Sequence, residues 1–359
     1  MTPTQQAKKP AAGFRTMFWC ALTPVLLAML VAYPASLYLG APVGGISRRG
    51  AWPERDYIWQ QEPPAIALLD NHAALQDPDV VVIGDSFSLP NAWQSVVGNA
   101  TGLRIKTYNY LNNHNCFLPW IERIADGLEG RAQAGNKLII IESIEHQFME
   151  RFREPERCAQ NSTFQVRPVV AGSLTWSRTS VHTQIDLARQ FQTLWHMWQV
   201  YAYPTRNAGE WVINAPLKRA DLFSNHKSDR LLYIDLDEQR LRWTAADMGQ
   251  AAQVIKKTQD RLEAAGFQFQ MLIIPDKLHA YEDELLTPLV AHPASDLART
   301  LRQAGVHAPD VLTPLKRAIY QSKDLYMPND DHLGTSGQTV LGRALIDAGA
   351  FNGLKAQTR

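Results

Sequence analysis

Three polar residues that lie far apart in the sequence could together supply a nucleophile, a base and an acid. Ser86 stands in the run Gly84-Asp85-Ser86-Phe87, and Asp330 and His332 share a polar loop near the C-terminus. A histidine can take the proton of a serine hydroxyl, and a neighbouring carboxylate holds that histidine in the required tautomer and orientation. This set of residues favours covalent acyl-transfer chemistry, although either motif alone could be a turn that caps a helix.

The elements that must position these residues follow from the hydrophobic pattern. Short apolar or alternating runs predict strands at 79–83, 104–110, 137–141, 267–274 and 305–312. Helical spacing predicts helices at 91–98, 119–134, 251–265 and 335–348. Strands that alternate with helices predict a parallel sheet between two helical layers. Ser86 then lies at the carboxyl end of a strand, where α/β sheets place their ligands, and the following helix could offer N–H groups to an oxyanion.

The rest of the chain divides by composition into a linker, a large domain and an insertion. Residues 41–78 are rich in Pro, Gly and Trp and predict a linker that packs onto the domain. The α/β pattern defines a domain at 79–350, but residues 160–245 fit it less well. We interpret that stretch as an insertion that holds an aromatic helix at 185–203 and a hairpin around 231–243.

The N-terminal region predicts one membrane-spanning helix at 16–40. No charged residue occurs between Thr16 and Ser47, and a span needs about 20 apolar residues. Residues 1–15 are expected to be cytoplasmic because they carry three basic residues, Lys8, Lys9 and Arg15. The domain that follows is then exported. The alternative is a cleaved signal peptide, with cleavage near Ala35 or Ala41.

Charge and cysteine content narrow the classes of partner and cofactor. Lys and Arg total 36 against 35 for Asp and Glu, so no overall field favours nucleic acid. Cys20 lies in the apolar run, whereas Cys116 and Cys158 lie in the region expected to be exported, where they could form a disulfide. No Cys/His spacing indicates zinc, and we predict neither a metal nor a cofactor.

The order of the motifs resembles the SGNH/GDSL hydrolase superfamily and, more closely, the SGNH-like alginate O-acetyltransferase family. The resemblance covers residues 79–155 and 265–345. It rests on the Ser86 turn and on three further runs, Ile141-Glu142-Ser143-Ile144-Glu145-His146, Pro275-Asp276-Lys277 and Asp330-Asp331-His332-Leu333. There are departures. The serine and Asp/His modules are in the reverse order to the alginate enzymes, Leu333 replaces a tryptophan, and His146 replaces an arginine.

The resemblance implies an SGNH-like three-layer α/β/α fold in which Ser86 is acylated and His332 is the base. Asp330 is the expected acid, with Asp331 as the alternative. On an extended loop the side chain of Asp331 is expected to point away from His332. Superfamily esterases complete the oxyanion hole with an asparagine, for which Asn112 and Asn113 are candidates, although both could instead serve a turn.

The function implied by the resemblance is O-acetylation of an exopolysaccharide in the periplasm by an enzyme anchored in the inner membrane. The acetyl donor would be a membrane-bound O-acyltransferase, because acetyl-CoA is absent from the periplasm. Two alternatives stay open. One is an SGNH carbohydrate esterase that deacetylates glycans, and the other is a non-catalytic component of a polysaccharide export complex.

Overall fold

A computed structural model describes the chain at residues 12–39, 44–50, 52, 54–69, 77–109, 137–152, 167–169, 195, 211–289 and 296–354. Within these ranges a five-stranded sheet forms the centre of the molecule, with strand order β4-β2-β1-β3-β7. Four strands are parallel, namely β1 (Val80–Gly84), β2 (Ile105–Asn109), β3 (Leu138–Ile144) and β7 (Gln268–Ile274). The two-residue strand β4 (Arg167–Pro168) pairs antiparallel with β2 at one edge.

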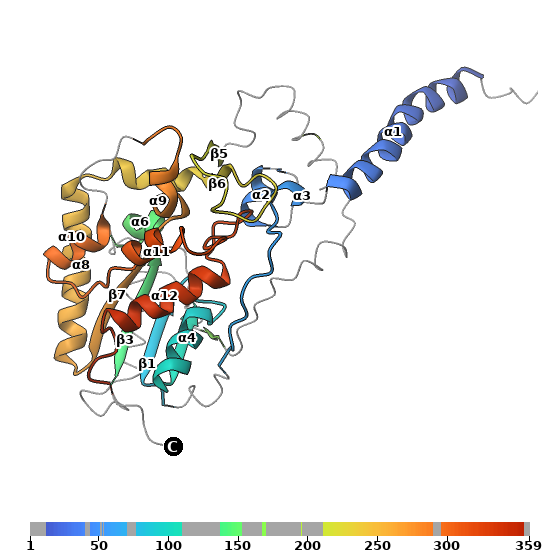
Figure 1. The fold of residues 1–359 in the computed structure, drawn as a ribbon. Helices are drawn as coiled ribbons and strands as arrows, with labels where there is room; N and C mark the ends of the chain where they lie inside the picture. Colours follow the sequence, from blue (N-terminus) through green and yellow to red (C-terminus); the bar gives the residue numbers. More distant parts are fainter. Residues whose placement is uncertain are drawn as a thin grey trace, which may run out of the picture.

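Helices cover both faces of this sheet, which confirms the predicted α/β fold (Figure 1). Val80 and Val82 of β1 face a core shared with α4 (Ala92–Thr101), α11 (Leu312–Ala318) and α12 (Thr335–Asp347). Val81 and Ile83 face the opposite core, because successive side chains of a strand point to opposite faces. That second core includes α6 (Phe148–Phe152), α8 (Ala245–Ala264) and α10 (Leu297–Gln303). The two apolar faces explain why β1 is a continuous run of buried residues.

Helices α4 and α12 pack closely, and this contact matters because each helix follows one half of the candidate site. A Cβ atom added at Gly342 of α12 would lie 2.8 Å from the Val96 Cβ and 2.9 Å from the Trp93 carbonyl oxygen of α4. Only a glycine permits that approach. The turn before α4 and the loop before α12 are therefore held beside each other.

Short elements follow the carboxyl ends of β3 and β7. The chain leaves β3 through η2 (Glu145–Gln147), and it leaves β7 through α9 (Lys277–Tyr281) and η6 (Glu282–Glu284). Within the predicted linker lie α2 (Gly45–Gly50) and α3 (Glu54–Tyr57). Ile46 and Tyr57 of these helices pack on an antiparallel pair made by β5 (Val212–Pro216) and β6 (Arg230–Ile234). This part of the linker region is therefore packed onto the domain.

The pair β5–β6 corrects the predicted hairpin at 231–243. Residues 231–234 belong to the second strand of the hairpin, and the first strand lies upstream at 212–216. Asp235–Arg242 form the 3₁₀ helix η5 instead of a returning strand. This segment carries five charged side chains, and it has no strand-like alternation of apolar and polar residues. The predicted helices at 119–134 and 185–203 fall outside the described ranges, apart from Trp195.

The predicted strand at 305–312 is also wrong. Residues 306–311 form neither strand nor helix, and a backbone hydrogen bond from Met271 N to His307 O at 2.8 Å joins them to the sheet edge. Pro309 has no N–H group to continue a ladder, and α11 begins at Leu312. An apolar run beside an edge strand therefore packs there without forming a strand.

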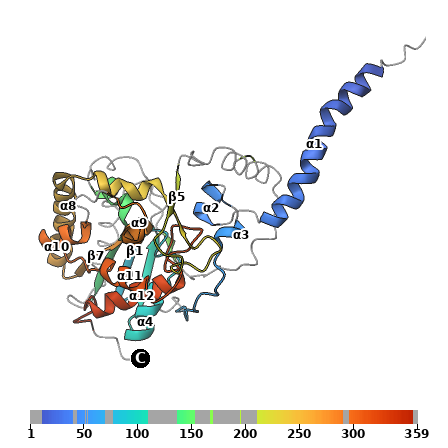
Figure 2. The ribbon, with the colours of Figure 1, turned by 45° about the horizontal axis from the view of Figure 1, so that its top comes forward.

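The N-terminal helix α1 spans Ala12–Leu39 and extends away from the α/β body in both ribbon views (Figure 2). Among the side chains of α1 that the structure describes, nine large apolar ones are exposed, including Trp19, Leu30 and Val31. No helix in the described part of the chain has the length and apolar character that would carry it across a membrane.

Candidate active site

The structure brings Ser86, His332 and Asp330 together as a continuous chain of hydrogen bonds. Ser86 Oγ lies 2.7 Å from His332 Nε2, and His332 Nδ1 lies 2.6 Å from Asp330 Oδ1. Ser86 follows β1, whereas the other two residues precede α12, so the sheet edge joins residues 246 positions apart in the sequence. The serine hydroxyl can pass its proton to Nε2 while the carboxylate holds Nδ1–H, which is the geometry of nucleophilic activation.

Phe87 fixes the plane of the histidine ring. Its ring stacks on the imidazole of His332, with centroids 4.6 Å apart and an angle of 24° between the planes. Phe87 is buried, and its backbone carbonyl oxygen accepts a bond from the Gln338 side chain of α12 at 3.4 Å. The residue after the nucleophile thus connects the serine turn to the base.

The serine turn is held by buried charged groups, namely Asp85 directly after β1, Glu142 of β3 and Arg151 of α6. The Asp85 carboxylate accepts bonds from Phe87 N and Ile144 N, both at 3.0 Å, and from Arg151 Nη1 at 2.8 Å. Burial raises the pKa of Asp85, but Arg151 and these amide groups outweigh burial and lower that pKa below its ordinary value. Asp85 therefore stays charged and holds the turn against β3.

Glu142 supports the other side of the same turn. Its Oε2 atom accepts from Asp85 N at 2.9 Å and from Ser88 Oγ at 2.8 Å. A Cβ atom at Gly84 would lie 2.5 Å from that oxygen, so the turn needs a glycine there. Burial and the charge of Asp85 raise the pKa of Glu142 well above its usual range.

The loop that carries Asp330 and His332 is compact rather than extended. Asp330 N bonds to Met327 O at 3.3 Å, and Met327 N bonds to His332 O at 3.0 Å. Lys277, the first residue of α9, stabilises this turn. Its Nζ donates hydrogen bonds to the carbonyl oxygens of Met327, Pro328 and Asp330 at 2.7, 3.1 and 3.0 Å. Burial lowers the pKa of Lys277 to about 8, despite the nearby carboxylates.

The expectation that Asp331 points away from His332 is wrong. Its Oδ1 atom lies 3.1 Å from His332 Nδ1, because in a compact turn consecutive side chains do not alternate between two faces as they do on an extended strand. Burial lowers the pKa of His332, but the hydrogen bonds that its ring donates to Asp330 and Asp331 outweigh burial and raise this pKa well above the ordinary value. Asp330 makes the shorter contact, and Asp331 adds a second negative charge.

Other candidate residues cannot be placed. Asn112, Asn113, Cys116 and Cys158 lie outside the described ranges, so the oxyanion donors and the disulfide stay predictions. Cys20, in α1, is exposed and has a free thiol.

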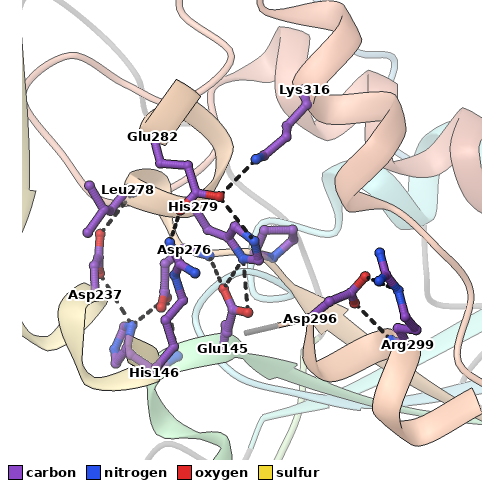
Figure 3. A network of polar contacts seen from close by, with 12 residues as sticks. Glu145, His146, Asp237, Asp276, Leu278, His279, Glu282, Asp296, Arg299 and Lys316 are labelled. Atoms are coloured by element: carbon purple, nitrogen blue, oxygen red, sulfur yellow. Dashed lines mark hydrogen bonds and ion pairs between the residues drawn. The ribbon is translucent and has the colours of Figure 1, made fainter. Parts of the chain in front are cut away.

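A second polar network lies at the carboxyl ends of β3 and β7, and its members are buried (Figure 3). His146 Nδ1 lies 2.7 Å from Asp276 Oδ1 and 3.6 Å from Asp237 Oδ1. His279 Nδ1 lies 2.8 Å from Glu145 Oε2. These contacts tie η2, η5 and α9 to one another. Three of the residues, Glu145, His146 and Asp276, come from runs that carried the family resemblance, so those runs serve to hold the loops at this edge of the sheet.

Two groups in the described part of the chain have the composition of metal ligands. One is His146 with Asp237 and Asp276, and the other is Asp330 and Asp331 with His332. In both groups a hydrogen bond of 2.6 or 2.7 Å already joins the histidine to a carboxylate. Hydrogen bonding accounts for both arrangements.

Asp237 makes the stability of the fold depend on pH. Burial and the charge of Asp276 raise the pKa of Asp237 well above its usual range. The folded state then holds this proton more tightly than the unfolded state, so the free energy of unfolding falls as pH rises above the ordinary carboxyl pKa. We expect Asp237→Asn, which has no such proton, to gain on the order of 1 kcal/mol relative to wild type as pH rises from about 4 toward neutrality.

Urea unfolding of both proteins at several pH values measures this difference. Asp260→Asn is the control, because Asp260 lies on the solvent face of α8, with its side chain 57% exposed. A difference that stays constant over the pH range would contradict the role given to Asp237.

An α/β domain with a serine after its first strand and an Asp/His loop before its last helix has the arrangement of SGNH hydrolase-like domains. Residues 228–350 match the family model described as SGNH hydrolase-like domain, acetyltransferase AlgX. This match confirms the resemblance seen in the sequence, and it contains Lys277, Asp330 and His332, whereas Ser86 precedes it. No curated protein matches the chain.

Proposed function

We propose that this protein is an O-acetyltransferase that acetylates hydroxyl groups of an exopolysaccharide through an acyl-enzyme on Ser86. The observation that carries the proposal is the hydrogen-bonded chain from Ser86 to His332 and Asp330, at 2.7 and 2.6 Å. It gains support from the family match, because the matched domain is that of an acetyltransferase. At family level, this points to acyl transfer onto a polysaccharide.

The first half-reaction loads the acetyl group. Ser86 Oγ attacks the carbonyl carbon of the donor ester while His332 Nε2 takes the hydroxyl proton. The tetrahedral intermediate collapses when the bond to the donor oxygen breaks, and His332 returns the proton to that leaving oxygen. Asp330 stabilises the imidazolium between the two transfers. Ser86 is left as an acetyl ester.

The second half-reaction repeats these steps with a sugar hydroxyl as the nucleophile. His332 takes the proton of the sugar hydroxyl, whose oxygen attacks the acetyl carbon, and the proton passes to Ser86 Oγ as the ester bond breaks. Water in place of the sugar would give an esterase by the same route. The outcome therefore depends on which hydroxyl enters the site.

We place the enzyme at the inner membrane, with its domain in the periplasm and α1 as the anchor. The support is the uncharged stretch from Thr16 to Ser47, the basic residues before it, and the exposed apolar side chains of α1. A membrane-bound O-acyltransferase would supply the acetyl group. Alkaline phosphatase fused after residue 60 should be active, whereas an inactive fusion with an active cytoplasmic reporter at that position would contradict this location.

The transfer reaction is tested by giving the full-length protein a chromogenic acetyl ester with and without a polysaccharide acceptor. We expect the acceptor to increase the rate of chromophore release and to become acetylated, as measured by the acetyl content of the recovered polymer. Release at one unchanged rate, with all acetyl recovered as acetate, would identify an esterase. No release and no labelling of Ser86 by a fluorophosphonate would favour a non-catalytic protein.

A further inference from the structure

The segment that follows α1 in the sequence reaches the loop of the candidate catalytic acid. Gly45 N, at the start of α2, donates to Asp330 Oδ2 at 2.5 Å. The next two amide groups, those of Ile46 and Ser47, both donate to the carbonyl oxygen of Asn329, at 3.2 and 3.0 Å. The two carboxylate oxygens of Asp330 are thereby divided, since Oδ1 bonds to His332 and Oδ2 bonds to Gly45.

Two glycines permit this approach. A Cβ atom at Gly44 would lie 2.2 Å from the Asn329 carbonyl oxygen, and one at Gly45 would lie 2.7 Å from Asp330 Oδ2. Both distances are too short for a side-chain carbon, so a larger residue at Gly44 would push against the loop backbone, and one at Gly45 would push the Asp330 carboxylate away. The amide groups of the segment can reach the loop only because these positions carry no side chain.

A buried glutamate fastens the same contact from the other side. Glu54, in α3, is 1% exposed, and it accepts a hydrogen bond from the Asn329 side-chain amide. Its second oxygen accepts from Ser47 Oγ at 2.6 Å and from Gly44 N at 3.4 Å. The glutamate therefore joins both ends of the segment to the residue before Asp330. Apolar packing of Ile46 and Tyr57 on β5 and β6 holds the segment in place.

We propose that the segment Gly44–Glu54 is a positioning element of the active site. It fixes the orientation of the Asp330 carboxylate, and that carboxylate in turn fixes the orientation of the His332 ring. The proposal deepens the proposed function, because it rests on Asp330 being the acid of that site. A carboxylate held at both oxygens cannot rotate away from its histidine, and preorganised geometry of this kind supports catalysis. Only residues 40–43 separate this segment from α1.

The charge of His332 reports the position of Asp330 directly. Two carboxylates on its own loop, Asp330 and Asp331, contact this histidine, and so does the hydroxyl of Ser86 after β1. Lys277 binds the carbonyl oxygens of the same loop. The charge of Asp331 also acts on His146, which follows β3. The hydrogen bond that His332 donates to Asp330 favours the imidazolium, so moving Asp330 away lowers the pKa of His332. Loss of folded protein alone would lower activity without changing this pKa.

The test measures the pKa of His332 by NMR in full-length protein labelled with ¹³C at the histidine rings, with the signal assigned from His332→Ala. We expect Gly45→Ala to lower this pKa by about 1 unit, because the added methyl group pushes Oδ2 away. Glu54→Gln keeps the shape of Glu54 but replaces one accepting oxygen by an NH₂ group. That group must face either the Asn329 amide or the Gly44 N–H, both of which are donors, so one hydrogen bond is lost. We expect this variant also to lower the pKa of His332. Gly249→Ala is the control, since nothing lies within 4 Å of its added carbon.

The same variants should lower kcat/KM for the acetyl ester by about 10-fold and move the acid limb of its pH profile to lower pH. A His332 pKa and a pH profile equal to wild type in both Gly45→Ala and Glu54→Gln would overturn the proposal. The NMR measurement needs no substrate. A lowered pKa in a protein without Ser86-dependent turnover would therefore support the positioning role while refuting the proposed function.

Discussion

We expect Ser86→Ala and His332→Ala each to reduce acetyl turnover by about 10⁴-fold or more, and the double variant to be no worse than either single one. The two residues act as one unit, because the 2.7 Å contact from Ser86 Oγ to His332 Nε2 is the path of the proton. Once one member is lost, the other has no function left to lose. Initial rates with a chromogenic acetyl ester, measured on the full-length protein, give the loss of activity in the two single variants and in the double variant.

Ser336→Ala is the matched control, since Ser336 lies in the first turn of α12, four residues after His332, and has no part in the proton path. We expect that variant to keep wild-type turnover. Additive losses in the double variant would show that the two residues act independently. Full activity in Ser86→Ala would refute an acyl-enzyme on this residue.

Asp330→Ala should be the next most severe change, lowering kcat by about 10²- to 10⁴-fold. Its carboxylate accepts a hydrogen bond from His332 Nδ1 at 2.6 Å and one from the His332 backbone N–H at 3.1 Å. Without the carboxylate, the ring can adopt the wrong tautomer and can rotate away from Ser86. Steady-state kinetics should show this loss in kcat, with little change in KM, because Asp330 orients the base and does not bind the donor.

We expect Asp331→Asn to lower the turnover rate only slightly but to change how kcat/KM depends on pH. Asp331 lies 3.1 Å from His332 Nδ1 and helps to raise the pKa of that histidine. The base works only when it is neutral, so activity falls as pH drops through this pKa. Removing one carboxylate lowers the pKa and should move the acid limb of kcat/KM to lower pH. A severe Asp331→Asn beside a mild Asp330→Ala would exchange the roles of the two residues.

The parallel core and the two halves of the site could be predicted from the sequence because both have local signals. Strand β1 is a continuous apolar run, β3 begins with four apolar residues and β7 ends with four, and α12 shows regular helical spacing. Ser86, Asp330 and His332 follow or precede such elements directly. Ser86 lies at the carboxyl edge of the parallel sheet, and the close contact of α12 with α4 at Gly342 brings the Asp330 and His332 loop beside it.

The supporting contacts could not be predicted, because they join residues that are distant in sequence and carry no motif. Gly45 approaches Asp330 across 285 positions, and Arg151 pairs with Asp85 across 66. The orientation of Asp331 depended on whether its loop is extended or compact, which Lys277 decides by binding three carbonyl oxygens beneath it. The Pro275-Asp276-Lys277 run contributed to the family resemblance but did not indicate what Lys277 would bind.

The most direct test of the central claim is to look for the acetyl group on Ser86. Wild-type protein is mixed with an activated acetyl ester, quenched in acid within the first turnover, digested and analysed by mass spectrometry. We predict one acetyl group on the peptide that contains Ser86, its absence in Ser86→Ala, and its loss when polysaccharide acceptor is added before the quench. Continued turnover with no acetyl group on Ser86 at any time point would contradict the acyl-enzyme mechanism.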